Sequence, residues 1–180
     1  METLEHVENQ LNYYFINDQL ENAGLMTDNL YKTHHDNPEI LSLCKKAYSR
    51  LGNNDQVINC LNLLIKTDLN NDRLYEERAL IYYDQGKYQL FEKSMLIAIQ
   101  INAKEFRYFQ PLVQYYKNKK LYYDAVTLLK SAYQKNPSEI CKRELDIALK
   151  LLQEDTVDNS AFFKEEEKEN HFKKITKSID

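Results

Sequence analysis

Few residues in this sequence have the type and spacing that catalysis or metal binding requires. His34, His35 and Asp36 are adjacent and would be the first candidates for a metal site. Neighbouring residues of a helix point about 100° apart, so two adjacent imidazoles rarely hold one ion. A histidine at the end of a helix is instead favoured by the helix dipole. We therefore expect no metal site at this position.

The cysteines and glycines do not form a catalytic pattern either. Cys44, Cys60 and Cys141 contain no CxxC pair, and an odd number cannot be fully bridged within one chain. They fit a reducing cytoplasm and helix packing better than a thiol nucleophile. Three scattered glycines are too few for a phosphate-binding loop, and the acidic run EEEKE is typical of a solvated surface. The sequence thus predicts no enzyme and no cofactor.

The charge and hydropathy of the sequence indicate which kinds of partner the protein can bind. The turn KNKK, Lys117 to Lys120, is the best basic patch, and tyrosines lie around it. A formal net charge of -4 nevertheless favours neither nucleic acid nor an anionic membrane. The start METLEHVENQ lacks the apolar run of a secretory signal, and no apolar stretch is long enough to span a bilayer. We expect a cytoplasmic protein with a protein partner and no membrane insertion.

The elements that would position such residues follow from a repeat. The chain has only 3 glycines and 3 prolines, and runs such as QVINCLNLLIK predict helices joined by short turns. Shifting the sequence by 34 residues superimposes Tyr14, Tyr48, Tyr82 and Tyr116. Four repeats follow without insertion, 4–37, 38–71, 72–105 and 106–139, and we expect two helices in each.

Within each repeat, apolar residues recur at fixed positions. The first helix carries a large one at position 4, and the second carries two residues seven apart, at positions 20 and 27. In LYYDAVTLLKSAYQKNP these two are Ala125 and Ala132, whose small side chains let the two helices approach closely. Pro111 predicts a late start or a kink in the first helix of the fourth repeat.

The end of the chain differs from the repeats. Residues 140–153 predict one amphipathic capping helix that covers the last repeat. Residues 154–180 form a charged tail, for which two interpretations stay open. It is either a solvated, partly helical extension or a helix that docks through Phe172, Ile175 and Ile179.

This pattern resembles the tetratricopeptide repeat (TPR) family, whose repeats have tyrosine at position 11, glycine at 15, alanine at 20 and 27 and proline at 32. The fourth repeat matches best, whereas Leu11, Lys45 and Phe91 depart from the small residues usual at their positions. The resemblance covers residues 4–139. It implies an all-α, right-handed superhelix of about four TPR helix pairs plus a C-terminal capping helix, with the TPR array at 4–153 and the tail at 154–180.

The resemblance also implies a binding site. In TPR proteins the first helices line a concave groove that binds a peptide or a helix of a partner protein. Here this groove is expected to have an apolar centre at Leu80 and Tyr83 and more basic residues towards the fourth repeat. The expected groove residues are Asn12, Lys46, Arg73, Leu80, Tyr83, Arg107, Gln114 and Lys117. Glu8 and Glu77 stand where the heat-shock co-chaperones grip a terminal carboxylate, so that subclass is not expected.

The leading hypothesis is a non-enzymatic interaction module or scaffold. One alternative is a dedicated chaperone resembling the small TPR chaperones of bacterial secretion systems. Another is a permanent subunit of a multiprotein assembly that makes its contacts through the convex surface and the tail.

Overall fold

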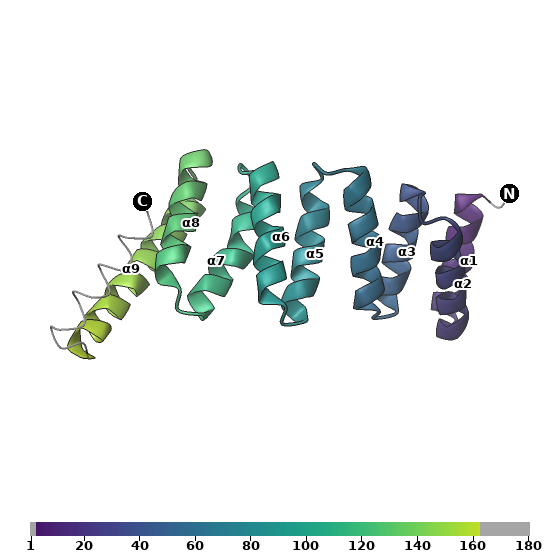
Figure 1. Ribbon diagram of the computed structural model, residues 1–180, viewed down its shortest axis with the longest axis horizontal. Helices are drawn as coiled ribbons and strands as arrows, with labels where there is room; N and C mark the ends of the chain where they lie inside the picture. The colour runs from purple at the N-terminus through teal and green to yellow at the C-terminus, as the bar shows by residue number, and fades with distance from the viewer. Residues whose placement is uncertain (1–2, 163–180) are drawn as a thin grey trace. The chain divides into compact units, whose positions relative to one another are not determined.

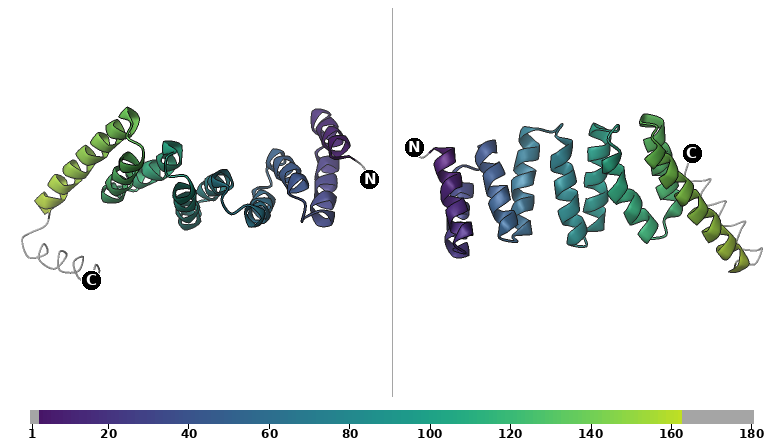
Figure 2. Two further views of the ribbon diagram at one scale, coloured as in Figure 1. Left: turned by 90° about the horizontal axis from the view of Figure 1, so that it is seen from above. Right: turned by 180° about the vertical axis from the view of Figure 1, so that it is seen from behind.

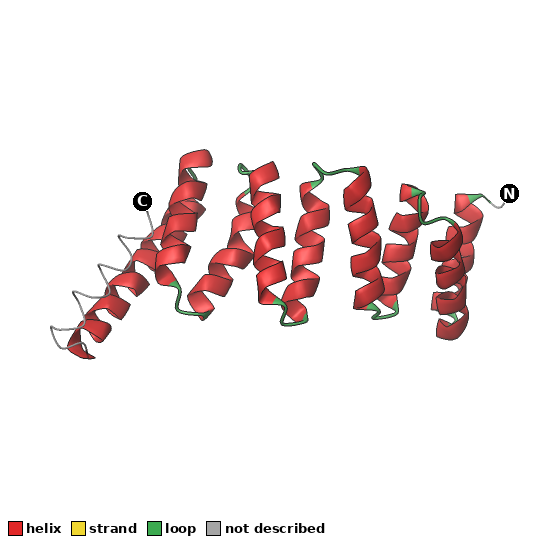
Figure 3. Ribbon diagram, viewed as in Figure 1, coloured by secondary structure: helices red, strands yellow, loops and turns green. Residues whose placement is uncertain are grey.

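The computed structural model describes residues 3–162, and within this range the regular secondary structure is helical throughout (Figures 1 and 3). Four helix pairs follow one another, and a longer helix ends the described chain. The first helices of the pairs are α1 (Leu4–Ile16), α3 (Pro38–Arg50), α5 (Asp72–Asp84) and α7 (Phe109–Asn118). The second helices are α2 (Leu20–Thr33), α4 (Asn54–Thr67), α6 (Tyr88–Ile101) and α8 (Tyr122–Lys135), and α9 (Glu139–Phe162) follows.

The chain divides into two compact units, an N-terminal unit through Asn102 and a C-terminal unit from Ala103. The N-terminal unit holds three helix pairs, and the C-terminal unit holds the fourth pair and α9. In the left view of Figure 2, α3 to α6 are seen nearly end-on and alternate between two rows. Four helix pairs and a final helix confirm the predicted all-α fold class.

The helix spacing explains the sequence period. The first three first helices begin at Leu4, Pro38 and Asp72, and these starts keep the 34-residue spacing of the tyrosines. All four second helices keep it as well, beginning at Leu20, Asn54, Tyr88 and Tyr122. The side chains of Asn37 and Asn53 cap two of these starts: Asn37 Oδ1 accepts hydrogen bonds from the amides of Glu39 and Ile40. Such caps satisfy amide groups that a helix cannot pair internally.

Each turn inside a helix pair has the same backbone. Asp18, Gly52, Gly86 and Lys120 occupy the same repeat position, and all four have positive φ, from 55° to 71°. The residue after each donates an amide hydrogen bond to the carbonyl of the periodic tyrosine, as from Asn53 to Tyr48 over 2.9 Å. A left-handed residue followed by this bond closes a helix in the Schellman manner. The left-handed residue of each turn therefore lies at the repeat position at which TPR sequences carry glycine.

Small and large residues complement each other between paired helices. Ala125 and Ala132 are 0% and 3% exposed on α8, and Phe109 and Tyr116 of α7 are also buried. In the second repeat, Val57 and Leu64 occupy the two alanine positions and belong to one core cluster with Leu41 and Tyr48. The core volume is thus kept by different residues in different repeats.

The fourth pair begins late, as Pro111 predicts. A 3₁₀ turn, η1 (Phe106–Tyr108), precedes α7, and Pro111 is the third residue of that helix. At this position the amide hydrogen would have no partner inside the helix, so the missing donor of proline costs little. The prediction for Pro111 is confirmed.

Helix α9 does not end at Gln153 but continues to Phe162. Its buried side includes Cys141 and Ala148, both 0% exposed, and the Cys141 Sγ lies 3.6 Å from the carbonyl oxygen of Leu129 on α8. The expected docking residues Phe172, Ile175 and Ile179 lie outside the described residues.

Candidate functional site

In the N-terminal unit, all five expected groove residues are exposed on first helices. Asn12 lies on α1, Lys46 on α3, and Arg73, Leu80 and Tyr83 on α5. We call the exposed side of α1, α3 and α5 the first-helix face. The other three expected groove residues, Arg107, Gln114 and Lys117, belong to the C-terminal unit and are not part of this face.

The two apolar residues expected at the centre of this face lie on α5. Leu80 is 43% exposed and Tyr83 is 37% exposed. The Tyr83 ring makes edge contacts with the rings of Phe91 and Tyr88 on α6, with centroids 5.1 and 5.7 Å apart. These contacts hold the ring in place while leaving part of it open to solvent, which is the usual setting of an aromatic anchor at an interface.

Two polar contacts join successive first helices. Arg50 of α3 donates to the Asn12 side chain of α1 over 3.2 Å, and its guanidinium lies 3.9 Å from the centre of the Phe15 ring. Further along, Lys45 of α3 forms an ion pair with Glu77 of α5. Both contacts cross from one repeat to the next, so this face holds neighbouring repeats together.

The Lys45–Glu77 ion pair alters the electrostatics expected at Glu77. Glu77 was expected to repel a partner's carboxylate, but its charge is balanced by Lys45. Lys45 itself stands where TPR repeats usually carry a small residue, and its length lets it reach the next first helix. Glu8 therefore disfavours a carboxylate-gripping site more strongly than Glu77 does.

The three expected residues of the C-terminal unit all contact other side chains. The guanidinium of Arg107 donates to the Tyr108 hydroxyl over 2.7 Å and lies 4.6 Å from the centre of its ring. The amide of Gln114 donates to Asn118 over 2.8 Å. Lys117 donates to Glu144 of α9 over 2.6 Å, and its side chain is only 12% exposed.

Lys117 is consequently a poor candidate for a cation that attracts a partner. Its charge is already paired with Glu144, and most of its side chain is buried. Sequence spacing could not show this, because it does not fix where α9 crosses the end of α7.

The buried groups that titrate are held in their neutral forms. Burial, together with nearby Asp28, raises the pKa of the Cys44 thiol to about 11. Burial and the neighbouring Cys44 raise the pKa of the Cys60 thiol to about 12. Burial and its hydrogen bond to Asp28, at 2.7 Å, raise the pKa of Tyr48 as well. Thiols in this state are poor nucleophiles, so these residues serve packing.

The adjacent histidines make only local contacts. His34 Nδ1 lies 2.6 Å from the Thr33 hydroxyl, and His35 Nδ1 lies 3.4 Å from the carbonyl oxygen of Lys32. In the described part of the chain, no group of three or more His, Cys, Asp or Glu side chains is arranged to hold a metal ion. Nor does any helix of residues 3–162 combine the length and apolar character needed to cross a bilayer.

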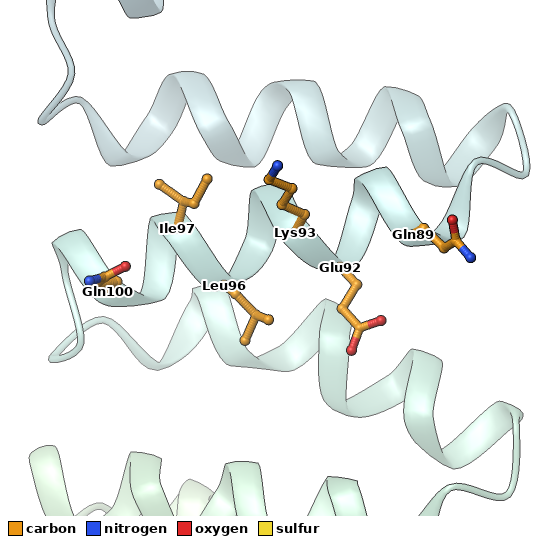
Figure 4. A pocket seen from close by; sticks show the side chains of 6 residues that line it. All are labelled: Gln89, Glu92, Lys93, Leu96, Ile97 and Gln100. Carbon is orange, nitrogen blue, oxygen red and sulfur yellow. The ribbon is translucent and has the colours of Figure 1, made fainter.

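A shallow depression of about 370 Å³ lies along one side of α6. Figure 4 shows that its six lining side chains come from this one helix. They are Gln89, Glu92, Lys93, Leu96, Ile97 and Gln100. A depression lined by one helix does not enclose a small molecule, so it adds no binding site.

Comparison with known proteins identifies the fold. No family model and no curated protein matches the sequence. A tetratricopeptide repeat protein from Parabacteroides merdae matches 87% of this chain and 61% of its own, with a TM-score of 0.56 and 16% sequence identity. This chain thus spans less than two thirds of that protein's length.

Two further structures match over most of both chains. MamA AMB-1 has a TM-score of 0.58 and 15% identity, over 82% of this chain and 81% of its own. A Bacteroides ovatus protein, provisionally described as protein binding, has a TM-score of 0.56 and 14% identity, over 85% of this chain and 99% of its own. The chain therefore has the fold of tetratricopeptide repeat proteins, as its sequence pattern predicts.

Proposed function

We propose that this protein is a non-enzymatic interaction module whose first-helix face binds a segment of a partner protein. The observation that carries the proposal is the exposed apolar area of Leu80 and Tyr83 on α5, with Tyr83 held by the rings of Phe91 and Tyr88. Exposed anchors of this kind, surrounded by polar groups, are typical of protein interfaces.

The other features of the chain agree with a protein partner in a reducing compartment. Its net charge of -4 does not favour nucleic acid. Cys44, Cys60 and Cys141 are all buried free thiols. The fold is shared with the Bacteroides ovatus protein that is provisionally described as protein binding.

Affinity capture from the source cells tests the proposal with a matched pair of variants. Leu80 on α5 and Leu90 on α6 are both 43% exposed, so Leu80→Ala and Leu90→Ala remove equal apolar groups from a first and a second helix. We expect Leu80→Ala to lose captured partner and Leu90→Ala to keep it. Tyr83→Ala should weaken binding of the same partner by about 1–3 kcal/mol.

The opposite pattern would point to another function. If Leu90→Ala loses the partner and Leu80→Ala keeps it, contacts through the second helices carry the interaction, as expected for a permanent subunit of an assembly. A partner that is released as a secreted substrate would instead support the chaperone alternative. Circular dichroism of each variant should show unchanged helix content, so that loss of binding is not caused by unfolding.

A further inference from the structure

Arg50 has an unusual setting on the first-helix face. It is the last residue of α3 and is exposed. Its guanidinium lies 3.9 Å from the centre of the Phe15 ring, and Nη1 donates to Asn12 over 3.2 Å. The ring and the amide both belong to α1. They fix the plane of the guanidinium without neutralising its charge.

Within residues 3–162, the positive charge of Arg50 has no carboxylate partner. Lys46 is exposed one helical turn before Arg50, so the two cations share a side of α3. Among the described residues neither of them forms an ion pair, whereas Lys45 and Lys117 are both paired with glutamates. Asn12 takes one of the five N–H donors of Arg50, and no other described residue accepts from the remaining four.

A purely structural role explains only part of this arrangement. An arginine in the last turn of a helix is favoured by the helix dipole. The dipole does not require an aromatic ring beneath the guanidinium or a second unpaired cation one turn away. Fixing a guanidinium in advance lowers the entropy lost when it binds a planar carboxylate, which it matches with two parallel hydrogen bonds.

We propose that Arg50 and Lys46 bind an acidic side chain of the partner segment, with Phe15 and Asn12 as positioning residues. The proposal rests on the proposed function, because it assigns the chemistry of the ligand to the same face. Ile16, which is 80% exposed and follows Phe15 in the chain, adds exposed apolar area at the end of α1. Exposed Glu8 lies one turn before Asn12 on α1 and restricts the acidic group to the α3 side.

A pair of labelled peptides tests the ligand chemistry. One peptide alternates leucine, aspartate and serine, and its twin carries asparagine in place of every aspartate. We expect the full chain to bind the acidic peptide about tenfold more tightly than its twin, as one charge-assisted hydrogen-bonded contact provides. This preference should decrease as salt is added, since both cations are exposed.

Substitutions assign the preference to Arg50. Arg50→Gln should reduce the tenfold preference to about twofold or less. Lys66→Gln is the matched control, because Lys66 is an exposed cation in the last turn of α4, a second helix. It removes the same charge from the same unit and should leave the preference intact.

A separate pair of variants tests whether Phe15 positions the guanidinium of Arg50. Phe15→Leu keeps an apolar side chain but removes the ring, and it should lower the preference for the acidic peptide without changing binding of the neutral twin. Phe15→Tyr restores the ring and should restore the preference. Equal weakening of both peptides by Phe15→Leu would show that Phe15 only packs.

Each remaining outcome decides the proposal. Equal affinity of wild-type protein for both peptides overturns the acidic-group site and leaves the proposed function standing. An unchanged preference in Arg50→Gln also overturns it. If neither peptide binds at millimolar concentration, the site is wrong, and the capture experiment with Leu80→Ala still decides the proposed function independently.

Discussion

Lys120 has the same left-handed backbone as Gly52, with φ of 57° against 70°, because both residues stand at the same position of their repeats. A lysine in this conformation is strained by its Cβ, whereas glycine is not. The chain thus keeps one turn geometry with residues whose conformational strain at positive φ differs widely.

The first prediction concerns this turn. Lys120→Gly should raise the free energy of unfolding by about 1 kcal/mol because it relieves the strain at positive φ. Asp18→Gly should gain less, since aspartate tolerates this region better than lysine does. In the reverse direction Gly52→Ala should cost about 1 kcal/mol through the backbone alone, because a Cβ at Gly52 would meet nothing within 4 Å.

Urea unfolding of the three variants checks this ranking. A loss of stability in Lys120→Gly would contradict the account of the turn, since the lysine side chain would then contribute more than its backbone costs.

The second prediction concerns close packing in the fourth pair. Ala125 is 0% exposed on α8, so Ala125→Leu should overpack the helix pair and destabilise the protein by about 1–3 kcal/mol. Exposed Ser131 on the same helix provides the control, and Ser131→Leu should change stability by less than about 0.5 kcal/mol. Equal melting midpoints for the two variants would refute the packing argument.

The third prediction concerns the buried thiols. Cys44 and Cys60 are 0% exposed, and their pKa values are raised from 9.0 to about 11 and about 12. Iodoacetamide at pH 8 should therefore leave both unmodified in the native protein and alkylate both in concentrated urea. Mass spectrometry of the peptides reports each site, and rapid modification of either thiol in the folded protein would contradict its burial.

The same pKa shifts predict how stability depends on pH. Between pH 9.0 and about 11, the unfolded chain loses its thiol protons while the folded chain keeps them. The unfolded state then binds fewer protons, so the free energy of unfolding falls as the pH rises through this window. Below pH 9.0 the thiols should make no pH-dependent contribution. Urea titrations on both sides of pH 9.0 measure the effect, and a constant free energy across the window would contradict it.

The fourth prediction concerns the ion pair that joins α7 to α9. Lys117→Glu places a second carboxylate beside Glu144 in a partly covered site and should destabilise the protein by about 1–3 kcal/mol. Adding Glu144→Lys reverses the pair and should recover most of the loss. If the double variant is no more stable than Lys117→Glu alone, the two side chains do not interact in solution.

The helices could be predicted well from the sequence because the same spacing of tyrosine and apolar residues recurs in each repeat. Tyr14, Tyr48, Tyr82 and Tyr116 mark the end of each first helix, and their carbonyls accept the turn hydrogen bonds. Pro111 predicted the late start of α7 for a local reason, the missing amide donor. Backbone geometry and side-chain volume are local properties, so they can be predicted from one short segment of the sequence.

The polar contacts of the candidate site could not be predicted in this way. Lys45 reaches Glu77 in the next repeat, and Arg50 lies on Phe15 of the preceding one. Long charged side chains can choose among several partners at similar distances, and helical position alone does not fix that choice. The pairing of Lys117 with Glu144 depends in addition on the direction of α9, which does not follow the repeat pattern.

The unbroken spacing of the four left-handed turns has a consequence for how such a gene changes. Because Asp18, Gly52, Gly86 and Lys120 recur without insertion or deletion, misaligned recombination between two repeats removes or adds a whole helix pair in frame. Within the N-terminal unit each pair packs on the next through α2 with α3 and α4 with α5, so a shortened or lengthened product meets the same type of junction at the new joint. The length of this array is therefore free to evolve in steps of one helix pair.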